Sequence, residues 1–316
     1  MTSQRWTATD VPDLRGRTAV VTGANSGIGY HTALVLAQHR ASVVLACRDR
    51  TRAADAADRI RATVPDADLA VQLLELSSLA SVRAAAAQLR TDHEHIDLLI
   101  NNAGAVRRRY HRTEDGFEST FAGNHLGPFA LTGLLLDRLL ATPGSRVVTV
   151  SSIGHRRGVI DFDDLNMARG YRAATAYFQS KLANLMFTYE LQRRLPDTST
   201  IAVAAHPGNA YTNFPRELNP VIRYLAGGHA TFLTSWMVQT PQMGALPTLR
   251  AATDPAVRGG EYYGPPGRAQ FTGYPERVES SARSHDIEAQ QRLWRESERL
   301  TGVVYPAASA RRVAGS

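Results

Sequence analysis

The sequence predicts an α/β protein built around a doubly wound parallel sheet. Short apolar runs of strand length alternate about six times with longer stretches of helical spacing. The runs are continuous rather than alternating in polarity, as in strands that helices cover on both faces. No Pro-, Gly- or Ser-rich linker divides the chain. We therefore expect a single domain that spans residues 1–316.

The apolar pattern places the elements in chain order. Strands are expected at 18–22, 42–47, 69–74, 97–101, 146–151 and 200–205. Helices are expected between them at 28–39, 50–62, 78–90 and 175–195. After residue 206 the alternation weakens, and the expected features are a Pro- and Gly-containing segment at 208–240, a charged amphipathic helix at 285–300 and a disordered tail at 306–316.

Composition excludes several classes of protein. Of the 316 residues 43% are hydrophobic, and the formal charge is +7. The arginines that carry this charge are spread along the chain without a long basic run, which favours a solvated arginine surface over nucleic-acid binding. The single cysteine, Cys47, excludes an intrachain disulfide and a Cys-rich metal site, and we expect no metal ion.

Neither a secretion signal nor a membrane span is expected. The first 17 residues contain polar and charged residues throughout and lack the apolar stretch of a secretory signal. The least polar long stretch, at 225–238, is shorter than the roughly 18 to 20 residues that cross a bilayer. The prediction is a cytoplasmic protein.

A glycine-rich turn follows the first expected strand and opens a helix. Glycines let the backbone turn tightly and approach a pyrophosphate, while the helix N-terminus supplies free N–H groups and the positive end of a dipole. The pattern indicates a dinucleotide site. Its candidate residues are Gly23, Asn25, Ser26, Gly27, Ile28 and Gly29.

The end of the second expected strand bears on which dinucleotide binds. An acidic residue there would bond the adenosine ribose hydroxyls and repel a 2′-phosphate, but this chain has Arg48. A guanidinium pairs with phosphate in a bidentate, charge-assisted way, which favours NADP(H) over NAD(H). The alternative is that Arg48 faces solvent as part of an arginine-rich surface.

Tyr177 and Lys181 share one face of the helix expected at 175–195. A tyrosine with an ordinary pKa of about 10 transfers protons poorly at neutral pH, and a nearby ammonium can lower that pKa. Lys181 is the only lysine in the chain, and a compact ammonium reaches places where a planar guanidinium does not fit. The alternative is an ordinary exposed pair of residues four apart.

These motifs occur in one order with several others. The full set is the turn at 22–29, Asn101-Asn102-Ala103-Gly104, Asn124, Ser151-Ser152, Tyr177 with Lys181, and Pro207-Gly208 followed by Thr212. In this combination the chain resembles the short-chain dehydrogenase/reductase family, which has a Rossmann fold, over about residues 15–265. The long gap between Ser152 and Tyr177, with "ACRDR" and "SKLANLMF", resembles the retinol dehydrogenase and protochlorophyllide reductase-like branch.

The resemblance implies an enzyme that interconverts a carbonyl and an alcohol, and Arg48 favours NADP(H) as its dinucleotide. It implies that Tyr177 is the general acid/base, that Ser152 rather than the competing Ser151 polarises the carbonyl, and that Asn124 supports a water-linked proton relay. Lys181 would bind the nicotinamide ribose and lower the tyrosine pKa.

The remaining implied cofactor contacts are Asn102, Ala103, Gly104, Pro207, Gly208 and Thr212, together with Glu75 and Leu76. Glu75 stands where the family often has Asp beside the adenine ring, so that contact is expected to be longer or absent. A catalytically silent dinucleotide-binding sensor or interaction protein is the alternative function.

The predicted partner is a small hydrophobic carbonyl or alcohol, with a homo-oligomer as a further possibility. The segment 208–240 is expected to cover the substrate edge of the sheet as a lid. Its apolar candidates are Tyr211, Phe214, Leu218, Leu225, Phe232 and Trp236, which could equally serve as packing or subunit-contact surface. Two arginine-containing clusters, at 107–109 and 155–157, are expected to be solvated or to recognise an acidic group.

Overall fold

The computed structural model describes residues 5–195, 198–209, 239–267 and 269–306. Its described residues form one sheet with the strand order β3-β2-β1-β4-β5-β6-β7-β8. The strands are β1 (Thr18–Thr22), β2 (Ser42–Cys47), β3 (Leu69–Leu73), β4 (Leu98–Asn101), β5 (Arg146–Val150), β6 (Ile201–Ala205), β7 (Tyr262–Gly264) and β8 (Glu276–Arg277). Only β8 is antiparallel to its neighbour. The predicted doubly wound Rossmann fold is confirmed.

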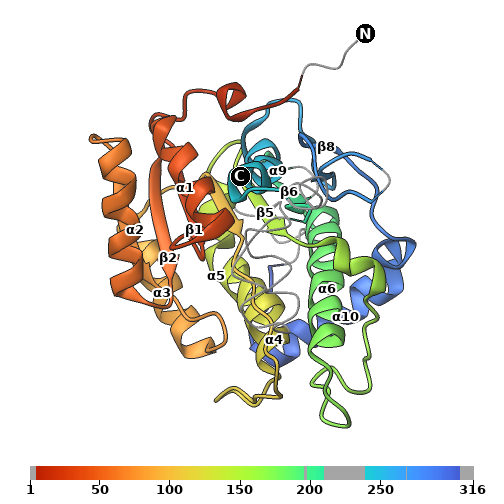
Figure 1. Cartoon of the computed structure of the whole chain (residues 1–316). Coiled ribbons are helices and arrows are strands. Elements are labelled where there is room, and N and C mark those ends of the chain that lie inside the picture. The colour runs from red at the N-terminus through yellow and green to blue at the C-terminus, as the bar shows by residue number, and fades with distance from the viewer. Residues whose placement is uncertain (1–4, 196–197, 210–238, 268, 307–316) are drawn as a thin grey trace, which may run out of the picture.

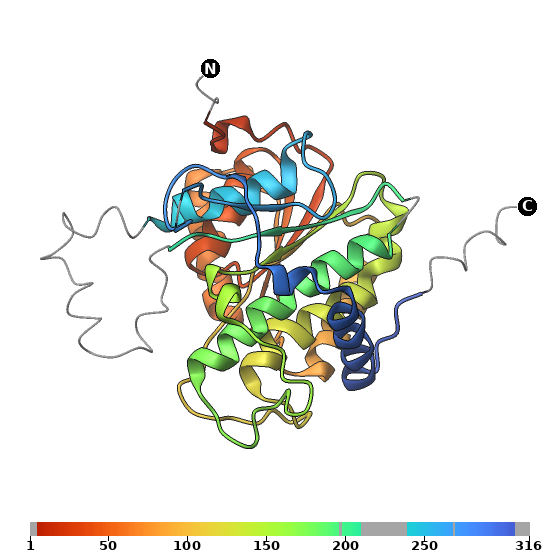
Figure 2. The same cartoon turned by 90° about the vertical axis from the view of Figure 1, so that its right-hand side faces the viewer.

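Helices cover both faces of the sheet (Figure 1 and Figure 2). One layer contains α1 (Gly27–Gln38), α2 (Arg50–Thr63) and α9 (Pro241–Thr253), and the other contains α3 (Leu79–Asp92), α5 (Gly127–Ala141), α6 (Ala173–Arg193) and α10 (Ile287–Thr301). In β1, Ala19 and Val21 join the first apolar cluster and Val20 the second, all fully buried. Because both faces of strands such as β1 are buried, these strands read as continuous apolar runs, whereas the edge strand β3 is partly exposed.

The strand order reverses between β1 and β4, and this positions the candidate site. From β1 the chain proceeds outward to β2 and β3 and then crosses to β4 on the other side of β1. In open α/β sheets ligands bind in the crevice outside the carboxyl ends of the strands at such a reversal. The loops after β1, β4, β5 and β6 all leave from this edge of the sheet.

Several elements were not predicted from the sequence. The helix α5 follows a short helix, α4 (Ser119–Phe121), and a π-helical turn at Ala122–Leu126, while α9 contains Pro247 in its interior. Strands β7 and β8 are only three and two residues long. The helix expected at 285–300 is present as α10. Most of the segment expected to form a lid, 208–240, and most of the tail lie outside the described residues.

The C-terminal helix α10 packs across α5 and α6 through its one tryptophan. The Trp294 ring is 2% exposed, stacks on Phe187 of α6 and meets Phe129 of α5 edge to face. Tyr305 closes this aromatic cluster and donates its hydroxyl to the Phe129 carbonyl at 2.7 Å. No helix in the described part of the chain has both the length and the apolar character to span a bilayer.

Candidate active site

Thr22, at the end of β1, joins the two loops that flank the strand-order reversal. Its hydroxyl accepts the backbone N–H groups of Asn102 and Ala103, each at 3.0 Å, and donates to the Ile100 carbonyl at 3.3 Å. The Asn102 side chain returns a bond to the Thr22 carbonyl at 2.8 Å. The glycine turn after β1 and the Asn102–Gly104 loop after β4 are therefore held together.

The glycine turn leaves the N-terminus of α1 open to an anion. Gly23 and Gly27 have positive φ angles of 68° and 55°, and a β-carbon on Gly29 would lie 2.4 Å from the Gly23 carbonyl oxygen. Ser26 precedes the helix without a side-chain capping bond. Helices α2, α3 and α10 are capped by Asp49, Ser78 and Asp286. The free N–H groups and close-packed glycines suit a pyrophosphate.

Cys47, at the end of β2, lies directly beneath this turn. Its side chain is 3% exposed. Burial raises the pKa of the thiol to about 11, although the backbone N–H groups of Ala24 and Asn25 hydrogen-bond to it. The thiol is therefore a structural support for the turn and stays protonated at neutral pH.

Arg48 and Glu75 occupy different environments at the adenosine end of the site. Arg48 is exposed and makes no hydrogen bond or ion pair with any residue that the structure describes. The Glu75 carboxylate accepts the backbone N–H of Ser77 at 3.0 Å and its hydroxyl at 2.8 Å. Leu76 is buried against the start of α5, where a β-carbon on Gly127 would collide with the Leu76 carbonyl.

The two consecutive serines after β5 have different partners. The buried Ser151 hydroxyl donates to the Lys181 carbonyl at 2.7 Å. The half-buried Ser152 hydroxyl accepts the Gly154 N–H at 3.1 Å and hydrogen-bonds to the Tyr177 phenol. Burial raises the pKa of Tyr177, and the bond to Ser152 partly opposes this rise. Ser152 is thus the serine that faces the tyrosine.

Lys181 lies buried beside the tyrosine ring. Its side chain donates from Nζ to the Val150 carbonyl at 2.9 Å, and Nζ lies 5.8 Å from the Tyr177 ring centroid. Burial lowers the pKa of Lys181 to about 8. Burial of the phenol dominates the shift in this structure, and a lowering of the tyrosine pKa by Lys181 stays a prediction. A β-carbon on Gly104 would lie 3.0 Å from Nζ, a tight contact with the lysine side chain.

Asn124 occupies the π-helical turn before α5. Its side chain accepts the Ala105 N–H at 2.8 Å and donates to the Ala105 carbonyl at 2.9 Å. It also donates to the Ser180 hydroxyl at 3.0 Å. Asn124 therefore clamps the loop that follows Gly104 to the helix that carries Tyr177 and Lys181. π-helical turns of this kind occur frequently at functional sites.

The turn at Pro207-Gly208 follows β6 at the same edge. Gly208 has a positive φ of 64°, and its N–H donates to Nδ1 of the buried His206 at 3.2 Å. The Gln239 amide bonds the Pro207 carbonyl at 2.5 Å. Thr212, like the apolar candidates between Tyr211 and Trp236, lies outside the described residues.

The arginine and histidine clusters divide between surface and core. Arg108 and Arg109 are exposed, and the Arg107 carbonyl accepts the Tyr171 hydroxyl at 2.5 Å. His155 is fully buried with both ring nitrogens bonded, so it cannot exchange protons with a substrate.

Sequence reasoning did not single out two polar residues that support the site. Asn184 donates to the same Val150 carbonyl as Lys181, at 3.2 Å, and His206 accepts from Gly208. Asn184 stands among apolar residues one turn after Lys181 on a fully buried helix face. A polar residue in such a place was the available signal, because buried amides need partners.

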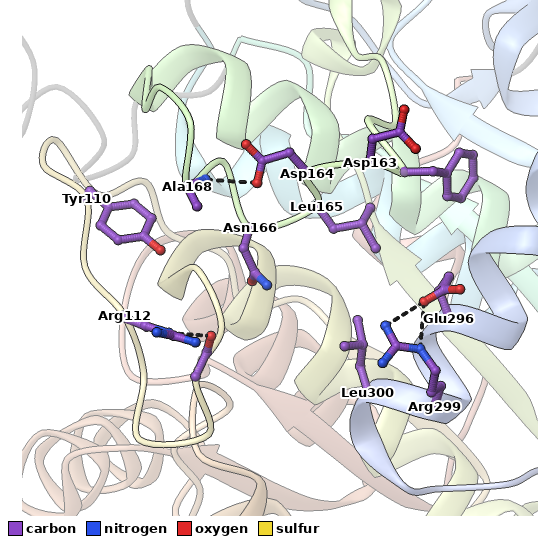
Figure 3. Close-up of a pocket in the computed structure, with 12 residues that line it drawn as sticks. Tyr110, Arg112, Asp163, Asp164, Leu165, Asn166, Ala168, Glu296, Arg299 and Leu300 are labelled. Carbon is purple, nitrogen blue, oxygen red and sulfur yellow. Dashed lines mark hydrogen bonds and ion pairs between the residues drawn. The ribbon is translucent and has the colours of Figure 1, made fainter.

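A separate pocket of about 320 Å³ lies between the loop after β4, the segment between Ser152 and Tyr177, and α10 (Figure 3). Its polar side chains largely bond to one another or to nearby backbone. Glu296 pairs with Arg299, and Asp164 accepts the Ala168 N–H. None of the predicted site residues lines it. Among the described residues, no cluster of three or more His, Cys, Asp or Glu could hold a metal ion.

Comparison with known proteins places the chain in a family. The family model for short chain dehydrogenase matches residues 17–222. The chain is 41% identical to retinol dehydrogenase 13 of Homo sapiens over 302 residues, which cover 92% of this chain and 86% of that protein. It is also 41% identical to retinol dehydrogenase 11 of Homo sapiens over 244 residues, or 77% and 75% of the two chains.

Solved structures agree with this assignment. A crystal structure of an uncharacterised protein from Mycobacterium Paratuberculosis has a TM-score of 0.79 and 39% identity, covering 96% of this chain and 100% of that chain. The Pseudomonas aeruginosa RhlG/NADP active-site complex has a TM-score of 0.61 and 27% identity, covering 79% and 94%. The chain is therefore an oxidoreductase acting on a carbonyl/alcohol pair, and it belongs to the short-chain dehydrogenase/reductase family, in its retinol dehydrogenase-like branch.

Proposed function

We propose that the protein uses NADP(H) to interconvert a carbonyl and an alcohol on a hydrophobic small molecule, with Tyr177 as the general acid/base. The observation that carries the proposal is the hydrogen bond between Tyr177 and Ser152 beside the buried Lys181 ammonium. This group lies at the edge of the sheet where the glycine turn leaves α1 uncapped. A proton-transfer pair and a dinucleotide cradle therefore meet at one crevice.

In the direction of carbonyl reduction, Tyr177 donates its phenolic proton to the substrate oxygen while Ser152 donates a hydrogen bond to the same atom. A raised pKa keeps Tyr177 protonated at neutral pH, as this step requires. Lys181 binds the nicotinamide ribose and places a positive charge beside the phenolate that forms. Asn124 keeps the loop after Gly104 in place against α6 and supports a water-linked relay of protons. The dinucleotide, when bound, supplies or accepts the hydride.

The chain's own residues fit this dinucleotide. The uncapped start of α1 offers N–H groups to the pyrophosphate, and Asn102, Ala103 and Gly104 line the adjacent loop. Arg48 has no partner among the described residues and is available to a 2′-phosphate. NADP in the RhlG complex and in the Beutenbergia cavernae structure with bound NADP supports the choice of cofactor. The retinol dehydrogenase relatives support a hydrophobic substrate.

Replacement of the phenol tests the proposal. Tyr177→Phe should lower kcat for aldehyde or ketone reduction by roughly 10² to 10⁴-fold, because the general acid is lost, while the Kd for NADPH changes little. Turnover is measured from NADPH absorbance across a panel of apolar aldehydes, ketones and quinones. Tyr189→Phe is the matched control, since Tyr189 lies on the same helix but its hydroxyl hydrogen-bonds to Ser280 instead of Ser152.

Two results would count against the proposal. Retained turnover in Tyr177→Phe would remove that residue from the acid/base role. Tight NADPH binding by the wild-type protein without oxidation across the whole panel would favour the dinucleotide-binding sensor instead.

A further inference from the structure

His155 bridges two segments that are far apart in the chain. It lies in the 3-10 turn Ile153–Arg157 that follows Ser152, and its side chain is fully buried. Its Nδ1 lies 2.7 Å from the Ser152 carbonyl oxygen, and its Nε2 lies 3.0 Å from the Ser281 backbone nitrogen. Ser281 belongs to the segment between β8 and α10, which crosses the molecule from the far edge of the sheet.

The two hydrogen-bond partners of His155 determine which of its ring nitrogens carries the proton. The Ser281 backbone N–H can only donate, so Nε2 must accept and carries no proton. The Ser152 carbonyl can only accept, so Nδ1 carries the proton and donates. Burial lowers the pKa of His155 to about 4, which keeps the ring in this neutral form at neutral pH. Both nitrogens are satisfied by backbone groups.

We propose that His155 is a positioning residue for Ser152, and this inference rests on the role proposed above for Ser152. The Ser152 carbonyl receives two bonds from His155, one from the ring and one from the backbone N–H at 3.0 Å. These bonds fix the peptide plane that follows Ser152. The backbone N–H of Gly154, which directly precedes His155 in the chain, donates to the Ser152 hydroxyl at 3.1 Å. The imidazole thus sets the orientation of the hydroxyl that faces Tyr177.

The C-terminal segment anchors this arrangement at more than one point. Arg156 donates to the Glu279 carbonyl at 2.9 Å, and Arg283 donates to the Gly158 carbonyl at 3.3 Å. These two bonds flank the contact between His155 and Ser281. The segment that leads into α10 therefore holds the serine loop from outside, and it does so without touching the reacting groups itself.

Two substitutions separate the ring nitrogens. In His155→Asn, the amide nitrogen can replace Nδ1 as donor to Ser152, but the acceptor for Ser281 is lost. In His155→Gln, the amide oxygen can replace Nε2 as acceptor, but the donor to Ser152 is lost. Each variant loses one buried bond, so their melting temperatures should fall by similar amounts. We expect kcat to stay within about threefold of wild type in His155→Asn and to fall by roughly tenfold to a hundredfold in His155→Gln, with NADPH Kd unchanged in both.

A second pair of variants changes Ser281, whose backbone N–H is the hydrogen-bond partner of His155 Nε2. Ser281 has φ −70°, which proline adopts, so Ser281→Pro removes the N–H donor, and the proline Cδ takes the place of the hydrogen bond and displaces the imidazole. Ser281→Ala keeps that N–H and serves as the control. We expect Ser281→Pro to lower kcat several-fold through loss of the fixed ring orientation, and Ser281→Ala to behave as wild type.

The outcomes distinguish the inference from the function on which it rests. Equal losses of kcat in His155→Asn and His155→Gln that follow their melting temperatures would overturn the inference and leave His155 a structural residue. Equal kcat in Ser281→Pro and Ser281→Ala would do the same even if the His155 variants fail to fold. Wild-type turnover in Ser152→Ala would instead overturn the proposed role of Ser152.

Discussion

At the Lys181 side chain, two contacts restrict which cation fits. Its Nζ donates to the Val150 carbonyl at 2.9 Å, and the α-carbon of Gly104 lies so near that a β-carbon there would be 3.0 Å from Nζ. A guanidinium is wider and presents its donors in a plane. The chain has many arginines and one lysine, and the lysine lies where a compact ammonium fits beside the Gly104 loop.

We therefore expect Lys181→Arg to lose turnover although the charge is kept. The displacement of groups around the reacting centre should lower kcat by about a hundredfold. Arg193→Lys is the control, since Arg193 pairs with Glu190 near the end of the same helix and should tolerate the exchange. Steady-state kinetics with saturating NADPH checks both. Near-normal turnover in Lys181→Arg would mean that charge alone is sufficient.

The preference for NADP(H) should depend on Arg48. Arg48→Glu should weaken NADPH binding about tenfold to a hundredfold and leave NADH binding unchanged or stronger, because a charge-assisted pair with the 2′-phosphate is replaced by repulsion. The ratio of kcat/KM for the two dinucleotides measures the effect. Arg61→Glu, at the far end of α2 beside Asp58, changes net charge equally and should not alter the ratio. An unaltered ratio in Arg48→Glu would show that the phosphate is read elsewhere.

Sequence motifs identified the candidate catalytic side chains but not the electrostatics around them. Tyr177, Lys181 and Ser152 were predicted because their spacing matches a known pattern, and the structure brings them together. The burial that raises the pKa of Tyr177 could not be predicted, since burial depends on how whole layers pack and no local motif encodes it. The supporting bonds of Asn184 and His206 depend on partners that simple sequence patterns do not indicate.

At the scale of elements, the turn between β1 and α1 combines positive φ angles with a close backbone approach. A β-carbon on Gly29 would lie 2.4 Å from the Gly23 carbonyl oxygen and 2.5 Å from the Asn102 amide nitrogen. Neither neighbour can move without separating the loops after β1 and β4. The turn and the Asn102 loop therefore behave as one rigid unit, and a substitution in either should change the conformation of both.

Gly29→Ala should consequently weaken NADPH binding by more than tenfold and lower the melting temperature by several degrees, the effect of roughly 1 to 3 kcal/mol of overpacking. Gly144→Ala is the control: Gly144 has φ 72°, and a β-carbon there would meet nothing within 4 Å, so the exchange should cost about 1 kcal/mol and leave binding intact. Titration calorimetry and thermal unfolding measure the two effects. Normal binding by Gly29→Ala would place the pyrophosphate elsewhere.

Element prediction succeeded where both faces of a strand are buried and failed where local signals are weak. Strands β1, β2, β4, β5 and β6 were found because layers on both sides impose continuous apolar runs, and the partly exposed edge strand β3 was found from its apolar residues alone. Helix α9 was missed because Pro247 in its interior argues against a helix, and neighbouring layers override that preference. Strand β7 has only three residues and follows β6 through pairing that no local pattern indicates.

For the whole molecule, three buried histidines should set the onset of acid unfolding. Burial lowers the pKa of His125 and His206 to about 3 and that of His155 to about 4. The unfolded chain binds these protons near pH 6.5 and the folded chain does not, so the stabilisation is fully present above pH 6.5 and is lost as pH falls toward the folded pKa values of about 4 and about 3. Each histidine contributes up to about 1.4 kcal/mol per pH unit.

Urea unfolding at pH 7 and pH 5 measures this loss before most carboxylates titrate. His206→Asn keeps an acceptor for the Gly208 N–H but cannot titrate, so its stability should fall less between the two pH values than that of the wild type. Equal free energies of unfolding at pH 7 and pH 5 in the wild type would contradict the assignment of these histidines as neutral and buried.

Because Cys47 lies under the glycine turn, the reactivity of its thiol can be used to follow movement of that turn. It is the only thiol in the sequence, it is 3% exposed, and backbone groups of Ala24 and Asn25 cover it. A thiol reagent can reach it only when the turn lifts away from β2. The rate of alkylation therefore measures how often the glycine turn at 22–29 opens. Added NADPH or NADH should slow this rate, and the concentration dependence gives the affinity for each dinucleotide without a substrate or an introduced label.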